Sequence, residues 1–117
     1  MKTTKGKSKL DNSNNDMQLV FELVKTIPFG KVSTYGAIAN ALGLHARIVG
    51  YYLNLSHQYI NIPAHRVVNR NGMLTGKMHF ATIDTMQQLL EAEGVAVKDD
   101  SVLDFDQKFW NPLHHNY

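Results

Sequence analysis

The sequence predicts a mainly α-helical domain with a helix-turn-helix and a small β-hairpin, an arrangement of the winged-helix type. Three observations support this fold class. Apolar residues recur at helical spacing along most of the chain. Glycines and a proline stand where these periodic segments end. The dipeptide Asn71-Gly72, which is favoured in tight turns, separates two short apolar stretches. The length of 117 residues fits one small domain.

The first predicted helix follows a polar segment. Residues 1–15 are rich in Lys, Thr, Ser and Asn, and we expect them to form a disordered basic tail. Asp16 is of the residue type that caps helix N-termini, and Pro28 and Gly30 are of the types that end helices. The apolar residues at helical spacing between them are Met17, Val20, Phe21, Val24 and Ile27.

Two short helices are predicted next. Ser33 or Thr34 is suited to cap a helix that runs to Leu42, and Gly43 suits the left-handed conformation that often follows a helix end. A third helix is predicted from about His45 to Leu55. The tight glycine-containing turn between the two helices gives the helix-turn-helix pattern. The apolar residues expected to face inward are Ile38, Ala39, Leu42, Ile48, Val49, Tyr52 and Leu53.

The hairpin is predicted to pair residues 66–68 with Met73-Leu74 around the Asn71-Gly72 turn and to form the wing. A fourth helix is predicted from about Ile83 to Glu93, ending at Gly94. The remaining chain is expected to form a short strand and a docked aromatic tail. The domain is therefore predicted to span residues 16–112, followed by a mobile tail at residues 113–117.

Charge is segregated along the chain. No Asp or Glu occurs between Leu23 and Ile83, and this stretch carries several lysines, arginines and histidines. An acid-free basic segment is typical of a protein that binds a polyanion such as nucleic acid, although solvated helix faces and loops would give the same pattern. The acids of the C-terminal part are Asp84, Glu91, Glu93, Asp99, Asp100, Asp104 and Asp106.

Composition excludes several classes of protein. The chain has no cysteine, so it has no disulfide and no thiolate metal ligand. His57, His65 and His79 lack the spacing of metal ligands, and no metal is expected. No apolar run approaches the roughly 20 residues that span a bilayer. The N-terminus does not resemble a secretory signal, and we expect a cytoplasmic protein, nucleoid-associated if bacterial.

Several segments resemble the O6-alkylguanine-DNA alkyltransferases. Ile27–Ala39 matches the family pattern Ile-Pro-x-Gly-x-Val-x-x-Tyr-Gly-x-Ile-Ala, and Arg47–Gly50 resembles the start of its recognition helix. Ile62–Val68 resembles the active-site segment Pro-Cys-His-Arg-Val, and Leu89–Gly94 resembles the closing Leu-Leu-x-x-Glu-Gly. In this family the cysteine accepts the alkyl group, and Ala64 stands at its position here.

Alanine carries no nucleophile, so the resemblance points to the alkyltransferase-like group, whose members are not enzymes. The group shares the fold of the alkyltransferase C-terminal domain and binds O6-alkylguanine without repairing it. The implied partners are double-stranded DNA that contains O6-alkylguanine and the damage-recognition proteins of nucleotide excision repair. The resemblance implies no cofactor, and we expect a monomer.

The resemblance also assigns DNA-binding residues. A base inside a duplex must be flipped out before a protein can inspect it. Arg47 matches the residue that enters through the minor groove and fills the gap, and Tyr35 matches the tyrosine that contacts the flipped nucleotide. The implied DNA-binding residues are Thr34, Tyr35, Arg47, Gly50, Tyr51 and Lys77. The implied lesion pocket consists of Tyr35, Pro63, Ala64 and Val67.

These assignments have plainer alternatives. Arg47 could bind a phosphate from an exposed helix face. Tyr35 could be a core aromatic residue with its hydroxyl at the surface. Thr34 and Ser33 could form an ordinary N-cap, and Lys77 could contact only phosphate.

Three residues are expected to have a structural role. His65 and Glu93 match the relay that activates the thiol in the transferases. Without a thiol, we expect them to form a buried, hydrogen-bonded pair. Arg66 is expected to brace the same segment and not to contact DNA.

Two other functions remain open at this point. A winged-helix transcription regulator would read DNA sequence, but it would give the segment Pro63–Val68 no purpose. A true alkyltransferase whose cysteine had been exchanged for alanine would retain this segment. The missing N-terminal domain, and the family's Gly-Gly pocket loop, which is not visible in Thr75–Thr82, argue against that alternative.

Overall fold

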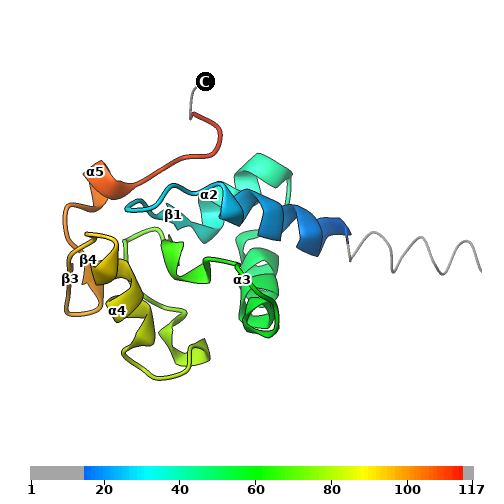
Figure 1. Cartoon of the computed structure of the whole chain (residues 1–117). Helices are drawn as coiled ribbons and strands as arrows, with labels where there is room; N and C mark the ends of the chain where they lie inside the picture. Colours follow the sequence, from blue (N-terminus) through cyan, green and yellow to red (C-terminus); the bar gives the residue numbers. More distant parts are fainter. Residues whose placement is uncertain (1–14, 115–117) are drawn as a thin grey trace, which may run out of the picture.

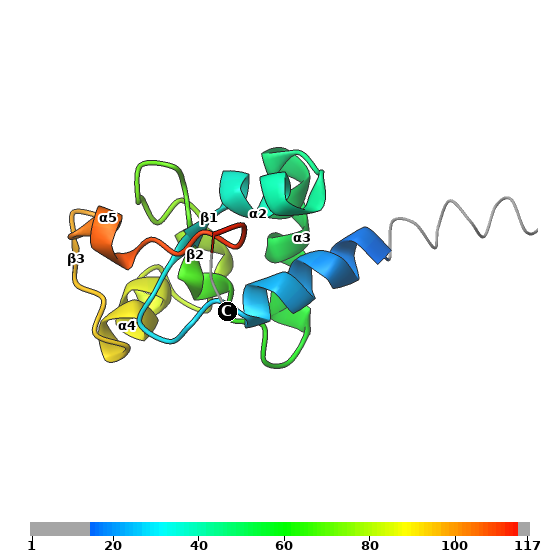
Figure 2. The same cartoon turned by 90° about the horizontal axis from the view of Figure 1, so that it is seen from above.

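The computed structural model of the chain describes residues 15–114. Most of the predicted basic tail and residues 115–117 of the predicted C-terminal tail lie outside the described residues. The N-terminal helix (residues 15–25) and helices α2 and α3 lie on one side of the molecule. Helices α4 and α5 and the β3–β4 hairpin lie on the other side (Figures 1 and 2).

The N-terminal helix begins earlier than predicted. Asp16 lies within it, because residue 15 already has a helical backbone, so the predicted N-cap at Asp16 is wrong. Beyond residue 25 the chain makes a tighter turn, in which the Ile27 amide donates to the Val24 carbonyl at 3.1 Å. Pro28 has no amide to continue this pattern, and the helix therefore stops in the predicted region.

The predicted helix-turn-helix is confirmed. Thr34 precedes α2 (Tyr35–Leu42), and its Oγ1 accepts a hydrogen bond of 3.0 Å from the Ala37 amide. Gly43 follows α2 with a φ of 72°, a conformation that glycine adopts without strain. Helix α3 (Ala46–Leu55) follows, and the two helices pack against each other. The remaining short helical turns are η1 (Ser56–Gln58), η2 (Ala64–Arg66) and η3 (Lys77–His79).

The predicted hairpin is wrong in its pairing. β2 (Val67–Val68) pairs in parallel with β1 (Ser33–Thr34), with Ser33 opposite Val67. The predicted turn does form, because the Gly72 amide donates to the Asn69 carbonyl at 2.9 Å and Gly72 has a φ of 81°. Both residues of β2 are buried, so both faces of this strand are covered. Such burial suits a strand between two layers better than an arm of an exposed wing.

The antiparallel hairpin of this fold lies further along the chain. β3 (Val97–Lys98) pairs with β4 (Ser101–Val102) around Asp99 and Asp100, which both have positive φ angles of 51° and 62°. A two-residue turn with positive φ matches the twist of the strands it joins. Leu74 is the last residue of the predicted wing, and its amide donates a hydrogen bond of 2.9 Å to the Asp100 carbonyl. The mainly helical fold class with a small hairpin is therefore confirmed, and the position of the hairpin is corrected.

The C-terminal part docks onto the centre of the molecule. Helix α4 (Thr85–Ala92) is shorter than predicted, and α5 (Phe105–Lys108) was not predicted. The Trp110 amide donates to the Val32 carbonyl at 2.7 Å, and Trp110 packs against the core, as expected for a docked aromatic tail. Among the described residues, no helix is long and apolar enough to cross a membrane.

Two groups of buried residues form the core, and they meet at β2. Val67 belongs to the group around the N-terminal helix, α2 and α3, whereas Val68 belongs to the group around α4 and the β3–β4 hairpin. Successive side chains of a strand point to opposite faces, so a two-residue strand can contribute to both groups. The helix-turn-helix is thus held on a central ladder that also carries the segment around Ala64.

Candidate nucleic-acid interface

A shallow cavity lies along α3, and we call it the α3 cavity. Its volume is about 360 Å³. It brings together four of the predicted DNA-binding residues, and sequence reasoning missed four further lining residues. The eight residues that line it are Tyr35, Arg47, Gly50, Tyr51, Asn54, Thr75, Gly76 and His79. None of these eight is acidic, in line with the acid-free stretch of the sequence.

Tyr35 is held between two glycines. It is the first residue of α2, so its position follows from the Thr34 cap. A Cβ atom on Gly76 would lie 2.9 Å from the Tyr35 hydroxyl, and a Cβ on Gly50 would lie 3.8 Å from the Tyr35 ring. Burial raises the pKa of Tyr35, and a hydrogen bond with the Thr75 side chain lowers it in part. The hydroxyl therefore stays protonated at neutral pH and can donate a hydrogen bond to a ligand.

Arg47 lies in the first turn of α3, with its side chain exposed. Among residues 15–114 no carboxylate pairs with it. Tyr51 lies four residues further on and therefore on the same helix face. Both residues also line a larger, mostly apolar hollow of about 810 Å³ with His45, Ala46 and Ile48. This face thus presents a free cation and an exposed aromatic ring to the solvent.

Two predicted DNA-binding residues already have partners within the protein. The Thr34 hydroxyl is buried and caps α2, which agrees with the alternative of an ordinary N-cap. Lys77 Nζ lies 2.6 Å from Asp100 Oδ2, in a partly exposed ion pair. Contacts of these two side chains with DNA stay predictions.

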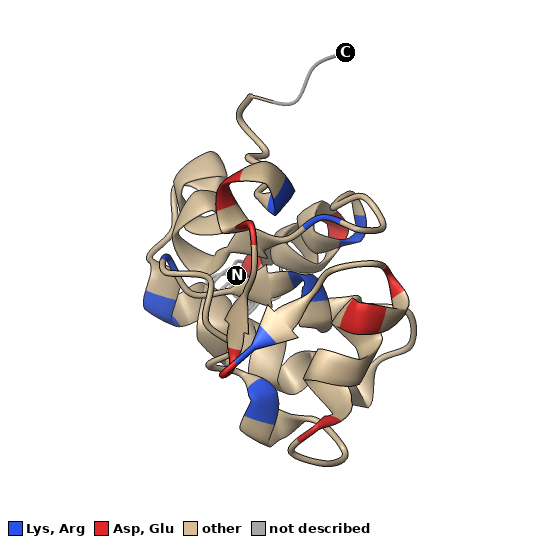
Figure 3. Cartoon of the chain, turned by 90° about the vertical axis from the view of Figure 1, so that its left-hand side faces the viewer, with Lys and Arg blue, Asp and Glu red and all other residues tan. Residues whose placement is uncertain are grey.

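Most acidic residues lie outside the helix-turn-helix, although burial and, to a smaller extent, the nearby Asp16 of the N-terminal helix raise the pKa of Tyr52 in α3. Figure 3 faces the side of the molecule that carries α4, α5 and the β3–β4 turn, and Asp and Glu positions are marked along the ribbon of these elements. The helices α2 and α3 come entirely from the acid-free stretch. The segregation of charge along the sequence therefore persists in the fold, and it leaves the α3 face free of negative charge from its own helices.

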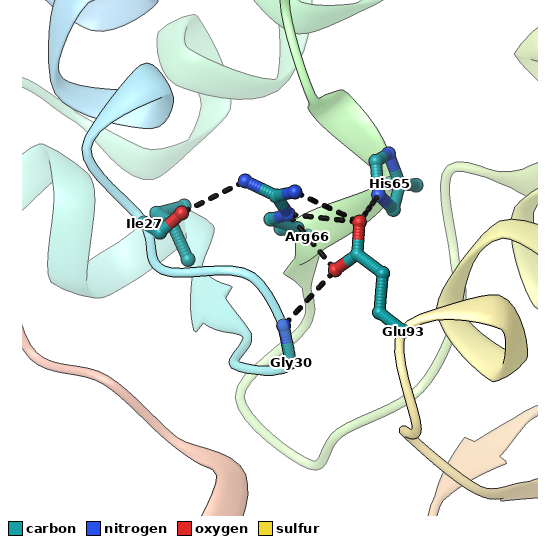
Figure 4. Close-up of polar contacts among 5 residues, drawn as sticks. All are labelled: Ile27, Gly30, His65, Arg66 and Glu93. Carbon is teal, nitrogen blue, oxygen red and sulfur yellow. Dashed lines mark hydrogen bonds and ion pairs between the residues drawn. The ribbon is translucent and has the colours of Figure 1, made fainter.

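Glu93 is the centre of a charged network that Figure 4 shows in detail. Glu93 Oε2 lies 2.7 Å from His65 Nε2 and 2.8 Å from Arg66 Nη2, and the Arg66 Nε donates to Glu93 Oε1 at 3.0 Å. The Gly30 amide donates to Glu93 at 3.2 Å, and Arg66 Nη1 donates to the Ile27 carbonyl at 2.9 Å. The predicted contact between His65 and Glu93 and the predicted bracing by Arg66 are confirmed.

The charge state of this network follows from its hydrogen bonds. Burial alone would raise the pKa of Glu93, but the hydrogen bonds from Arg66, His65 and Gly30 outweigh it and lower the pKa to about 2. Glu93 is therefore ionised at neutral pH. Because it joins the segment before α2, the segment around Ala64 and the end of α4, it fixes the relative positions of three parts of the chain.

The remaining predicted pocket residues lie apart from the α3 cavity. Ala64 and Val67 are buried in the core, at 7% and 1% exposure. Pro63 lines a different hollow, of about 400 Å³, together with Lys25 and other residues. Tyr35 packs against the same core group as Ala64, and this is the link between the two regions. A lesion pocket that combines Tyr35 with Pro63, Ala64 and Val67 stays a prediction.

The four lining residues that were not predicted differ in whether the sequence carries a signal for them. Asn54 follows Arg47 by seven residues, a spacing that places both on one helix face. It could therefore have been found from helical periodicity. Thr75, Gly76 and His79 come from an irregular segment whose position depends on the contact with the β3–β4 hairpin. No local signal in the sequence marks that contact.

A family model and individual relatives match this chain. The model described as "6-O-methylguanine DNA methyltransferase, DNA binding domain" matches residues 16–95. The chain belongs to this family. Alkyltransferase-like protein 1 of Schizosaccharomyces pombe is 35% identical over 99 residues, which cover 80% of this chain and 92% of the relative. The DNA base-flipping protein of Escherichia coli K12 is 36% identical over 107 residues, which cover 88% and 80%.

Solved structures of alkyltransferase-family proteins agree with this assignment. S. pombe Atl1 in complex with damaged DNA containing O6-carboxymethylguanine matches with a TM-score of 0.75 and 32% identity, over 83% of this chain and 95% of that one. Mycobacterium tuberculosis OGT in complex with DNA matches with a TM-score of 0.57 and 37% identity, over 66% and 48%. The predicted resemblance to the alkyltransferase-like group is confirmed.

Proposed function

We propose that this protein is a non-enzymatic sensor of DNA damage that binds O6-alkylguanine in duplex DNA and flips the damaged nucleotide out of the stack. One observation carries the proposal. The unpaired Arg47 and the half-buried Tyr35 line the same cavity, on a helix face without acidic residues. Relatives named as alkyltransferase-like and base-flipping proteins support it.

The side chains of the α3 cavity suit this task. Arg47 is a planar cation that can stack on bases and form several hydrogen bonds, so it can fill the gap left by a flipped nucleotide. Gly50, which has no side chain, lets the DNA backbone approach α3 closely. The Tyr35 hydroxyl, protonated at neutral pH, can donate to the extruded base. Lys77 and Thr34 would add contacts to phosphate.

The absence of alkyl transfer follows from the residues around the former nucleophile position. We infer that Ala64 occupies the place of the acceptor cysteine, so the lesion stays on the DNA. His65 keeps the contact with Glu93 that the resemblance assigns to the relay, in a partly buried network, but it has no thiol to serve. A bound but unrepaired lesion needs a second protein to remove it. We therefore propose that the complex, formed by a monomer in the cytoplasm, is passed to damage-recognition proteins of nucleotide excision repair.

The decisive experiment compares two duplexes that differ only in one base. We expect tighter binding to a duplex with O6-methylguanine than to the same duplex with guanine, at one stated salt concentration. Mass spectrometry of the recovered DNA should find the methyl group still in place. Equal affinities would contradict the proposal and favour a winged-helix regulator, and loss of the methyl group would indicate an enzyme.

Tyr35→Phe removes only the hydroxyl from the α3 cavity. We expect the preference for O6-methylguanine over guanine to fall roughly fivefold, about 1 kcal/mol, which is the usual net value of one neutral hydrogen bond. Binding to undamaged DNA should change little. Titrations of both duplexes would measure the ratio. Tyr59→Phe is the matched control, because Tyr59 is exposed and contacts Phe21 outside this cavity. A preference unchanged in Tyr35→Phe would remove the hydroxyl from the proposal.

Gly76→Ala tests the placement of the same hydroxyl without removing it. The new methyl group would lie 2.9 Å from the Tyr35 hydroxyl, so the Tyr35 side chain must shift from its present position. We expect a fewfold loss of lesion preference and little change in folding stability. Gly36→Ala is the control, because its Cβ would have nothing within 4 Å, and it should bind both duplexes normally. Equal behaviour of the two variants would show that the tight Tyr35–Gly76 contact has no role in binding.

A further inference from the structure

His79, the last residue of η3, lines the α3 cavity beside the proposed DNA-binding residues. Its side chain is exposed, and its presence there does not follow from any of the predicted roles. The other polar groups of the cavity are one guanidinium and neutral donors from Tyr, Asn and Thr. The cavity therefore offers hydrogen-bond donors and positive charge but no carboxylate of its own, which favours an anionic ligand.

A second histidine lies against the same segment. His57 follows α3 in η1, and its ring meets the Phe80 ring edge-on with centroids 4.5 Å apart. Phe80 is the residue next to His79. Partial burial lowers the pKa of His57, and repulsion from His79 lowers it further. The His57 imidazole therefore lies close enough to His79 to sense a positive charge there.

The charged and titratable groups around His79 do not relieve this repulsion. Arg47 and Tyr51 of α3 and Tyr35 of α2 face the cavity with it, and only Arg47 among them is charged at neutral pH, with the same sign as an imidazolium. Lys77 is on the same helical turn as His79. The acid that contacts this turn, Asp100, is held by Lys77 at 2.6 Å. Helix α4 also packs against η3, but among the described residues no ion pair joins His79 to Glu91 of α4 or to its N-cap Asp84. An anion from outside the protein would therefore supply the compensating charge.

We propose that His79 and His57 form a proton-accepting pair at the α3 cavity, which takes up a proton when an anionic oxygen group binds beside His79. The inference rests on the proposed function, because it concerns the same cavity. The anion is either a phosphodiester next to the flipped nucleotide or a carboxylate carried by the alkyl adduct. Both present oxygen atoms with a negative charge, which favours the protonated form of a nearby imidazole.

The consequence is a pH-dependent affinity with a defined sign. The bound state holds more protons than the free protein, so affinity must rise as the pH falls through the range in which histidine titrates. Uptake of one proton gives at most about a tenfold change in Kd per pH unit. We expect several-fold tighter binding at pH 6.0 than at pH 7.5, at one ionic strength, to a lesion duplex that supplies this anion.

Variants of single histidines test which residue is responsible. His79→Gln should bind more weakly at pH 6.0 and lose most of the pH dependence, and His57→Gln should reduce it. His79→Lys, with a permanent charge, should bind at pH 7.5 about as tightly as the unchanged protein does at pH 6.0. His114→Gln is the matched control, because His114 is exposed and its ring forms a hydrogen bond with the Asn111 side chain. This variant should keep the full pH dependence. Circular dichroism would verify that each variant is folded.

Three duplexes identify the source of the anion. If it is a phosphodiester, the pH dependence appears with O6-methylguanine and disappears when the linkages next to the lesion are uncharged methylphosphonates. If it is the adduct, the dependence appears only with O6-carboxymethylguanine. The inference is overturned if His79→Gln shows the same pH dependence as the unchanged protein. It is also overturned if the unchanged protein shows no pH dependence with any of the three duplexes. Either result leaves the proposed function intact if lesion preference persists, whereas loss of that preference at every pH contradicts the proposed function itself.

Discussion

Arg47→Ala should reduce affinity for an O6-methylguanine duplex by about 30-fold or more, roughly 2 kcal/mol. The side chain is exposed and has no partner in the described part of the chain, so its removal costs the free protein little. In the complex it is expected to fill the gap left by the flipped nucleotide. A fluorescent base placed opposite or beside the lesion would report flipping, and its signal should fall together with the affinity.

Two further variants separate stacking from simple charge. Arg70→Ala removes the same charge from the exposed turn before Gly72, outside the α3 cavity, and should weaken binding to damaged and undamaged DNA alike by a small factor. Arg47→Lys keeps the charge but loses the planar group, and it should retain binding to undamaged DNA while losing lesion preference. If Arg47→Ala and Arg70→Ala behave alike, Arg47 is only a phosphate contact.

Local signals in the sequence were sufficient for the helix-turn-helix, whereas α5 was not predicted. The Thr34 hydroxyl caps α2, and Gly43 ends it with a positive φ, so both boundaries of α2 are determined by adjacent residues. Local signals could not predict the strand with which Val67 and Val68 pair. The Asn71-Gly72 dipeptide forms its turn, but the strand before it pairs with Ser33 and Thr34. The preference for that partner comes from burial on both faces of the strand, a tertiary effect that no short motif reveals.

The residues of the candidate site also fall into those that local signals could predict and those that depend on tertiary contacts. Residues of α3 could be assigned to one surface because helical spacing determines which side chains share a face. The Glu93 network could be anticipated because the resemblance paired it with His65. The approach of Gly76 and His79 to Tyr35 depends on the segment between β2 and α4, where the chain has no regular structure beyond one short helical turn. Their place in the cavity therefore required the three-dimensional fold.

The network around Glu93 should make a large contribution to folding. Glu93→Gln leaves Arg66 partly buried without its counter-ion, and breaking a buried pair in this way costs about 3–5 kcal/mol. We expect the free energy of unfolding at pH 7, measured by urea denaturation, to fall by about 3 kcal/mol. Glu91→Gln is the matched control, because Glu91 lies on α4 but is exposed, and its carboxylate accepts a hydrogen bond of 3.0 Å from Gln87. It should be nearly neutral.

The pH dependence of stability gives an independent measurement of the same network. The carboxyl of Glu93 has a folded-state pKa of about 2, below its ordinary value of 4.5, so the folded protein binds this proton less readily than the unfolded chain. Its stabilisation is therefore fully present above pH 4.5 and is lost as the pH falls toward 2. The shift corresponds to about 3 kcal/mol, close to the cost expected for Glu93→Gln. Stability of Glu93→Gln should consequently fall less steeply between pH 4.5 and 2, and parallel curves would contradict an ionised, hydrogen-bonded Glu93 in the folded state.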